Sequence, residues 1–278
     1  MKSSTPPATP STPQEPGHSY LDVYSPAQIA RQVRDTGVAK AHLGVLPTLT
    51  LGLLAGAFIG LGAAFYLVVV TGAMLGFGPE RLLGGVAFSL GLVLVVVAGA
   101  ELFTGNNLIV MAWVSRRVTL GKLLRNWTLV YLANLVGAVA TAYLVHASGV
   151  LEMDAGRVAR TAVGVADAKV ALPWTQALVR GVLCNALVCL AVWLCTAAGS
   201  VEGKVLAVVF PVSAFVALGF EHSVANMFLI PLGMFSGASS ITPADFLGNL
   251  LPVTLGNIIG GSGLVALIYW AVYLRGVK

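Results

Sequence analysis

The sequence predicts an all-α integral membrane protein with six transmembrane helices, arranged as two inverted halves of three helices each. Three observations support this fold class. The chain of 278 residues is 57% hydrophobic and only 10% charged, whereas soluble domains carry about 25% charged residues. It contains six long apolar stretches, and similar motifs interrupt the second and the fifth of them.

Each of the six apolar stretches is long enough to cross a membrane, which takes about 20 residues of helix. They cover approximately residues 45–71, 82–114, 123–145, 177–198, 205–235 and 250–274. The second and the fifth are too long for one simple span, and polar residues interrupt both. We therefore expect a broken helix at each of these two places.

The chain before the first span divides into two segments. Residues 1–24 are rich in Ser, Thr and Pro and lack an apolar core, so we expect a disordered cytoplasmic tail and not a signal peptide. Residues 25–41 have helical spacing, with Ser25 as N-cap and Pro26 at the first helical position. Ile29 and Val33 share one face beside basic residues, which predicts an amphipathic helix on the membrane surface. Residues 42–278 form the six-span transmembrane domain.

The basic residues predict how the spans are oriented. Six is an even number, so both termini lie on the same side of the membrane. If that side is the cytoplasm, eleven of the 16 Lys and Arg residues face it, in agreement with the positive-inside rule. The opposite face keeps Arg81, Arg157, Arg160, Lys169 and Arg180. We therefore expect a multi-pass protein of the cytoplasmic membrane, and the net charge of +5 does not indicate nucleic-acid binding.

The three cysteines do not indicate a metal or a disulfide. Cys184, Cys189 and Cys195 lie in one apolar run, without a CxxC motif or a nearby histidine. A zinc site or a disulfide framework requires such spacings. We expect neither, and no cofactor.

The two halves of the chain resemble each other. AGAELFTGNNLIV at the first interruption aligns with LGFEHSVANMFLI at the second, so that Glu101 matches Glu221 and Asn106 matches Asn226. The following spans share the spacing of NWTLVYLAN and NLLPVTLGN. Three spans per half is an odd number, so the second half enters the membrane inverted. In such folds the two broken helices meet near the midplane and build the permeation site, because unwound backbone is tolerated only where it lines a cavity or packs against protein.

Away from the ends of the apolar stretches, three acidic or basic groups lie inside them: Glu101, Glu221 and His222. Charged groups are costly there, which makes them candidates for a functional site. We expect the glutamates to line the pathway or to accept hydrogen bonds from backbone N–H groups freed by the breaks. His222 titrates near neutral pH when unperturbed, which favours a proton or anion contact.

Four motifs occur in order along the chain: FSLGLVLVVVAGAELFTG, LCNALVCLAVW, GFEHSVANM and NLLPVTLGNIIGG. In these motifs the sequence resembles the formate/nitrite transporter family over nearly its whole length after the tail. The resemblance implies an aquaporin-like fold, a homopentamer and one substrate pore in each protomer.

The resemblance also implies roles for single residues. The family's central histidine corresponds to His222, and the threonine that faces it corresponds to Thr104. The vestibule lysine corresponds to Lys169, with Asn185 as the asparagine beside it. The periplasmic constriction corresponds to Phe88, Leu92, Val188 and Phe215, and the cytoplasmic constriction to Leu102 and Phe103 with Asn226 beside it.

This layout suits a small monovalent anion or its neutral acid. A bare anion at the bilayer centre costs several kcal/mol, and apolar constrictions increase that cost. Lys169 would attract the anion, His222 would donate a hydrogen bond or supply a proton, and Thr104 offers a second donor. We expect formate transport, passive or coupled to protons, across the lipid bilayer. Nitrite, hydrosulfide, lactate and acetate are alternative substrates, because AELFTG and LCNALVCLAVW are at least as similar to nitrite members. Asn106 and Asn107, directly after ELFTG, depart from both patterns.

Two other protein classes fit the sequence less well. An intramembrane enzyme requires a paired Asp, a Ser with a His, or a metal cluster within the membrane, and the apolar stretches offer one His and two Glu. A water or glycerol channel carries paired NPA motifs, and the sequence contains none. We therefore predict a transporter and not an enzyme.

Overall fold

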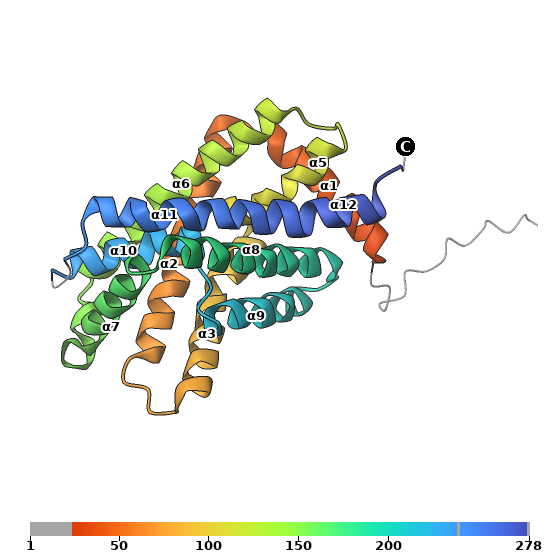
Figure 1. Cartoon of the computed structure of the whole chain (residues 1–278). Coiled ribbons are helices and arrows are strands. Elements are labelled where there is room, and N and C mark those ends of the chain that lie inside the picture. Colours follow the sequence, from red (N-terminus) through yellow and green to blue (C-terminus); the bar gives the residue numbers. More distant parts are fainter. Residues whose placement is uncertain (1–23, 238–239, 277–278) are drawn as a thin grey trace, which may run out of the picture.

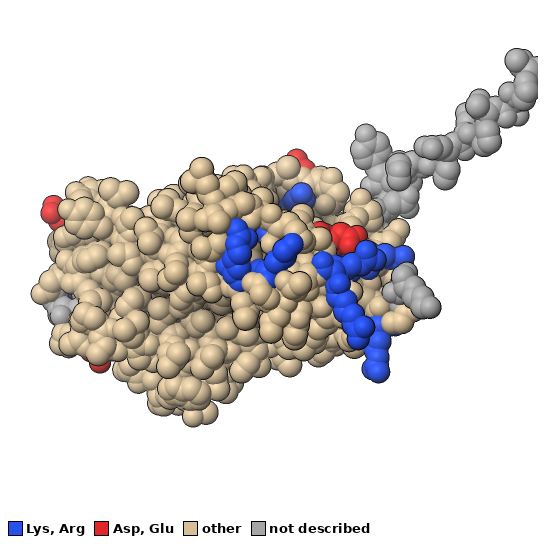
Figure 2. All heavy atoms as spheres, turned by 90° about the horizontal axis from the view of Figure 1, so that it is seen from above, with Lys and Arg blue, Asp and Glu red and all other residues tan. Residues whose placement is uncertain are grey.

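The computed structural model describes residues 24–237 and 240–276, and the predicted tail lies outside this range except for Tyr24. The described residues form helices joined by short turns (Figure 1). Five helical segments are long and apolar enough to cross a membrane: Val45–Val70, Phe77–Gly99, Leu120–Ala147, Trp174–Ala197 and Pro243–Tyr273. Large apolar side chains cover much of the outer surface. Figure 2 shows one face on which basic side chains gather in a few places and most of the area is uncharged.

The first helix, α1 (Pro26–His42), begins with a capping box in which the Ser25 and Gln28 side chains each bind the other residue's backbone N–H. Its apolar face is buried against protein, on the short segments η2 (Asn107–Ile109) and α5 (Val110–Val114). Gly37 permits this approach, since an added Cβ would lie 3.3 Å from the Ile109 Cα. This packing brings Lys40, in the last turn of the helix, to Glu101 at the first interruption.

The two predicted interruptions are both present. Helix α3 (Phe77–Leu94) continues as a π-helical turn, η1 (Val95–Gly99), and the chain is then extended up to α4 (Phe103–Asn106). Helix α9 (Val201–Ala217) ends before a left-handed Gly219, and the chain is extended up to α10 (Ser223–Phe235). Helices α9 and α10 have 17 and 13 residues, so neither belongs to the five long segments.

Residues 149–174, between the third and fourth expected spans, are polar and contain no long apolar run, which predicts a loop. That prediction is wrong. After a short 3-10 turn, η3 (Val150–Glu152), it forms helix α7 (Met153–Val170). Val158, Ala162 and Ala166 recur every fourth residue and are buried, and Ala166 lies directly against Gly233 of α10. Because charged residues separate these small side chains, the sequence shows no clear apolar pattern for this helix.

Four long helices pack as two close pairs. Helix α2 (Val45–Val70) contacts α6 (Leu120–Ala147), and α8 (Trp174–Ala197) contacts α11 (Pro243–Ile258). A Cβ added to Gly137 would overlap the Leu53 carbonyl, and one added to Gly256 would overlap the Leu178 carbonyl. Glycine therefore sets how closely the backbones approach. Helix α11 runs on through the π-helical η4 (Ile259–Leu267) into α12 (Ile268–Tyr273).

Candidate substrate pathway

One asparagine from a neighbouring helix fixes the backbone of the first break by hydrogen bonds. The side-chain amide of Asn134, on α6, donates to the carbonyl oxygens of Gly52 (2.7 Å) and Glu101 (2.9 Å). Its Oδ1 accepts from the backbone N–H of Phe103 at 2.9 Å. The bonds to Glu101 and Phe103 satisfy backbone groups that a continuous helix would have paired within itself, and Asn134 is fully buried.

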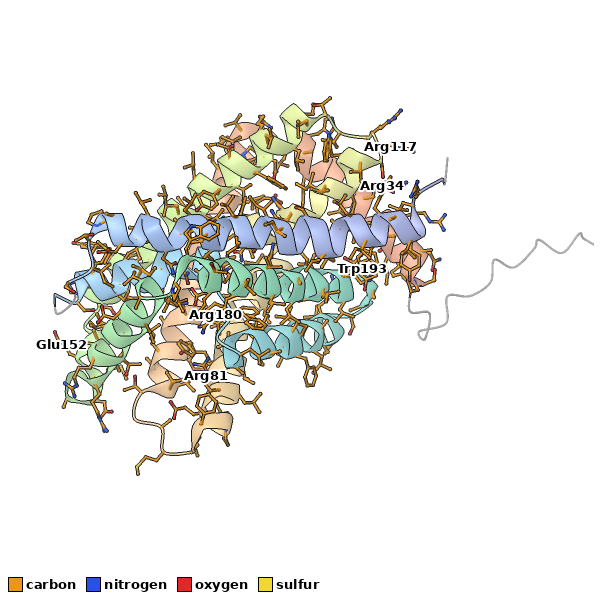
Figure 3. The ribbon with its side chains drawn as sticks, viewed as in Figure 1. Arg34, Arg81, Arg117, Glu152, Arg180 and Trp193 are labelled. Atoms are coloured by element: carbon orange, nitrogen blue, oxygen red, sulfur yellow. The ribbon has the colours of Figure 1, made fainter. Side chains whose placement is uncertain are left out.

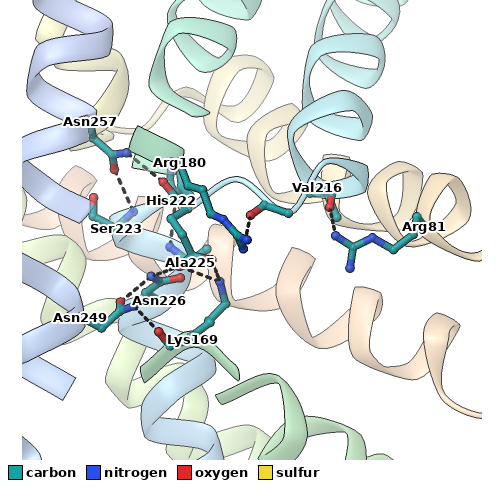
Figure 4. A network of polar contacts seen from close by, with 12 residues as sticks. Arg81, Lys169, Arg180, Val216, His222, Ser223, Ala225, Asn226, Asn249 and Asn257 are labelled. Atoms are coloured by element: carbon teal, nitrogen blue, oxygen red, sulfur yellow. Dashed lines mark hydrogen bonds and ion pairs between the residues drawn. The ribbon is translucent and has the colours of Figure 1, made fainter. Parts of the chain in front are cut away.

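Asn257, on α11, holds the second break in the same way. Its amide donates to the carbonyl oxygens of Gly181 (2.8 Å) and Glu221 (2.9 Å), and its Oδ1 accepts from the N–H of Ser223 at 2.9 Å. Figure 4 shows Asn257 against Ser223 at the start of α10. Each unwound linker therefore has a fixed backbone course.

A lysine–glutamate pair lies beside each break. Glu221 lies 2.9 and 3.1 Å from the Lys169 ammonium and accepts from the Asn226 amide at 2.7 Å. Asn226 also donates to Asn249, whose own amide donates to the Lys169 carbonyl oxygen. Figure 4 shows Lys169, Asn226 and Asn249 close together below His222. The buried carboxylate is thus paired with one cation and one amide.

The other half repeats this arrangement with different elements. The Lys40 ammonium of α1 lies 2.6 Å from Glu101, which accepts from the Asn106 amide at 2.7 Å. Asn106 also donates to Asn126, whose amide donates to the Lys40 carbonyl oxygen. The glutamates were expected to accept from freed backbone N–H groups. The asparagines described above bind those groups instead, and the carboxylates bind lysines.

Sequence reasoning did not find Lys40. It was assigned to an amphipathic surface helix, where a basic residue requires no partner. The internal repeat could have identified it. In the second half, Lys169 precedes its partner Glu221 by 52 residues, and in the first half Lys40 precedes Glu101 by 61 residues.

His222 and Thr104 meet where the two breaks approach each other. The His222 Nε2 lies 2.9 Å from the Thr104 hydroxyl oxygen. The His222 Nδ1 accepts from the backbone N–H of Ala225 at 3.0 Å and so caps helix α10. A nitrogen that accepts carries no proton, so the neutral ring has its proton on Nε2 and donates it towards Thr104. The threonine hydroxyl proton is then available to a third group.

Two cavities approach this pair. The Lys169 cavity, about 190 Å³, is lined by Lys169, Glu221, His222, Phe88, Phe215 and two arginines, Arg81 and Arg180. The Lys40 cavity, about 470 Å³, is lined by Lys40, Glu101, Asn106, Leu92, Leu102 and Lys204. Thr104 is fully buried and lines neither of them.

Only some of the apolar residues expected at the constrictions lie where they were placed. Leu92 was expected in the periplasmic constriction with Phe88, but it lines the Lys40 cavity. Phe88 and Phe215 meet edge to face at 5.8 Å between ring centroids, and Phe215 stacks against the His222 ring. Leu102 lines the Lys40 cavity, but Phe103 does not, and its ring packs against Trp127 and Tyr131 on α6. Leu102 is extended, so the next side chain points to the opposite side. Val188 is buried and lines neither cavity.

Two asparagines lie elsewhere than expected. Asn185 was placed beside Lys169, but its amide donates to backbone oxygens of Thr104 and Asn257 and to Asn107. It lies eleven residues into α8, roughly 16 Å along the helix at 1.5 Å per residue. Asn226, expected near Leu102, belongs to the Lys169 group, and Asn106 holds the corresponding place near Leu102.

Comparison with known proteins identifies the family of the chain. A family model described as "Formate/nitrite transporter" matches residues 27–271. The chain belongs to the formate/nitrite transporter family. It is 42% identical over 274 residues to "Formate channel FocA" of Escherichia coli (strain K12), covering 92% of this chain and 96% of that one. It is 44% identical over 268 residues to "Probable formate transporter" of Methanothermobacter thermautotrophicus, covering 90% and 97%.

A solved structure of this family has the same fold. "Pentameric formate channel with formate bound" superimposes with a TM-score of 0.77 at 39% identity and covers 83% of this chain and 98% of that one. These relatives of the formate/nitrite transporter family are channels and transporters, in line with the prediction that the chain is not an enzyme. Membership of this family, together with five helices able to span a bilayer, makes it a membrane protein.

Proposed function

We propose that the protein transports formate, as the anion or the neutral acid, through a pore in each protomer of a homopentamer. The observation that carries the proposal is the His222–Thr104 pair between two cavities that each contain a lysine–glutamate pair. The names of the relatives support the substrate and the pentamer.

The proposed fold has six spans in a 3+3 inverted repeat, with α9 and α10 as the interrupted fifth span. The matched contacts support it: Asn134 and Asn257 bind equivalent backbone atoms, 2.7–2.9 Å away, in the two halves. Lys40 on α1 and Lys169 on α7 each lie just before the first long helix of their half, and they bind equivalent glutamates. A group of one lysine, one glutamate and two asparagines occurs beside each break, as expected if the two halves have the same fold.

The proposed pathway runs from one cavity past His222 and Thr104 to the other. Apolar rings at Phe88 and Phe215 remove water from the anion on one side, and Leu92 and Leu102 do so on the other. A desolvated charge in this position costs several kcal/mol. The His222 Nε2–H and the Thr104 hydroxyl offset part of that cost by hydrogen bonding to the carboxylate. Association with a proton would lower the cost further, so proton-linked passage belongs to the proposal.

The proposed orientation puts both termini and the Lys40 cavity in the cytoplasm of a cell whose cytoplasmic membrane holds the protein. The distribution of basic residues supports it, since Arg34, Arg116, Arg117 and Arg275 lie at this end. Figure 3 shows Arg34 and Arg117 together at the end of the molecule away from Glu152.

A flux assay in proteoliposomes tests the function. Uptake of labelled formate is compared with that of nitrite, lactate and glycerol, for the wild type and for Thr104→Val, which keeps the shape of the side chain but removes its hydroxyl. We expect formate to enter fastest and Thr104→Val to slow formate about tenfold. Faster uptake of nitrite or lactate than of formate would change the substrate, and equal uptake in empty liposomes would reject transport.

A further inference from the structure

At the Lys169 cavity, Arg81 binds the last residues of α9, and Arg180 binds the linker that follows them. Arg81 donates from Nε to the Ala217 carbonyl oxygen (2.9 Å) and from Nη2 to the Val216 carbonyl oxygen (3.1 Å). Arg180 donates from Nη1 to the Gly219 carbonyl oxygen at 3.4 Å. Figure 4 shows both guanidinium groups directed at this linker from two different helices.

These carbonyl groups would otherwise oppose an anion. The last carbonyl oxygens of a helix lack partners within the helix, and the helix end carries a partial negative charge. The end of α9 lies at the Lys169 cavity, since Phe215, Val216 and Gly219 all line it. The arginines cover this negative end with two positive charges.

The Lys169 side chain does not itself provide net charge there. Its ammonium lies within 3.1 Å of both Glu221 oxygens, and the pair together is neutral. None of the ion pairs formed among the described residues includes Arg81 or Arg180, whose hydrogen-bond partners are uncharged carbonyl groups. The positive charge of the Lys169 cavity therefore comes from the two arginines.

The opposite cavity differs. The lysine–glutamate pair recurs there, but the described residues that line it include Lys204 and no arginine. Gly181 corresponds to Gly52 in the repeat, so the place of Arg180 is taken by Leu51. Both cavities thus contain a lysine–glutamate pair, but two arginines line the Lys169 cavity and one further lysine lines the Lys40 cavity.

We propose that Arg81 and Arg180 attract the permeant anion into the Lys169 cavity, and that the neutral Lys169–Glu221 pair receives it from them. The inference rests on the proposed anion transport. Fixed charges at the mouth of a low-dielectric cleft raise the local concentration of a counter-ion, by about 10-fold to 1,000-fold at low salt. Salt weakens this attraction, since the Debye length falls to about 8 Å at 0.15 M.

The test separates charge from hydrogen bonding. In Arg81→Gln/Arg180→Gln both charges are lost, whereas Arg81→Lys/Arg180→Lys keeps them and loses the forked geometry. Arg160→Gln is the matched control, because Arg160 is exposed on α7 and lies outside the cavity. Initial formate uptake is measured against formate concentration at about 20 mM and 200 mM salt, in right-side-out and inside-out membrane vesicles.

At low salt we expect the double Gln variant to raise the half-saturating formate concentration about tenfold, with little dependence on salt. The effect should occur in right-side-out vesicles only, and the double Lys variant and Arg160→Gln should resemble the wild type. If the Lys variant is as impaired as the Gln variant, the arginines act by shaping the linker and the inference is wrong. It is also wrong if the Gln variant resembles the control.

Two precautions keep the outcome decisive. Arg180→Gln alone breaks a single 3.4 Å hydrogen bond and replaces the double variant if that one does not fold. A failure of the proposed function looks different, because the wild type itself would then take up no formate.

Discussion

Replacing His222 tests the chemistry at the centre of the pathway. His222→Asn keeps the cap of α10, because asparagine is among the best N-cap residues and its Oδ1 can accept from the Ala225 N–H as Nδ1 does. The shorter amide does not reach the place of Nε2, so the donor that faces Thr104 at 2.9 Å is lost. His222→Phe removes the donor and the cap together and adds an apolar ring.

The size of the effect follows from these contacts. A hydrogen bond to a charged group contributes about 1.5–3 kcal/mol, and each 1.36 kcal/mol changes a rate tenfold. Thr104 can still donate in His222→Asn, so we expect formate flux to fall about tenfold. In His222→Phe we expect a fall of about 100-fold or more, and the lost cap lowers stability by about 0.5–2 kcal/mol.

The pH dependence decides whether the ring also exchanges protons. Nδ1 cannot take a proton while it accepts from Ala225, so the ring is expected to donate a hydrogen bond and to remain neutral. A small carboxylic acid has a pKa of about 3.9, as Asp does. From about pH 5 to 8 its neutral fraction falls roughly tenfold per pH unit, whichever residue occupies position 222.

Labelled formate uptake into vesicles across this range is the assay, with the amount of folded pentamer measured for each variant. We expect profiles of the same shape for the wild type and His222→Asn, shifted only in rate. Lys169 and Glu221 face the same cavity and are present in both proteins, so they cannot produce a difference between them. A step in the wild-type profile that His222→Asn lacks would refute the neutral-ring reasoning.

Three further substitutions test the surrounding structure. Lys169→Ala leaves the Glu221 carboxylate buried without its cation, which costs about 3–5 kcal/mol; formate flux and melting temperature should both fall, and Lys169→Arg should do less harm. Unchanged flux in Lys169→Ala would remove the lysine from the pathway. Asn257→Ala leaves the Ser223 N–H and the Glu221 carbonyl unpaired, at about 1–3 kcal/mol each, so the purified pentamer should melt at a clearly lower temperature. Gly137→Ala forces a Cβ onto the Leu53 carbonyl and should destabilise the protein by about 1–3 kcal/mol, whereas Gly121→Ala on the same helix meets open space and should be neutral or slightly stabilising; equal melting temperatures for the two variants would contradict the packing.

Local patterns in the sequence were sufficient to predict the five long apolar helices and both breaks. Polar residues inside apolar stretches have few tolerable positions in a membrane, so Glu101 and Glu221 marked both interruptions. The meeting of His222 with Thr104 followed from the equivalence of the two breaks together with the family resemblance. These features depend on neighbours in sequence or on a repeated motif.

Features set by tertiary packing were not predictable in the same way. The partner of Glu101 is on α1, and only the docking of that helix brings the Lys40 ammonium to the carboxylate. Helix α7 was missed because its buried stripe consists of small residues between charged ones. Phe103 points away from the cavity because its neighbour Leu102 is extended, a backbone detail that composition does not encode.

The order of the ion-pair partners along the chain has a consequence for biosynthesis. Lys40 is synthesised 61 residues before Glu101, and Lys169 is synthesised 52 residues before Glu221. A charged residue at the centre of a helix entering the translocon costs about 2.5–3.5 kcal/mol. In both halves the lysine has already emerged from the ribosome when the glutamate enters the membrane. Each glutamate can therefore form its ion pair during membrane insertion.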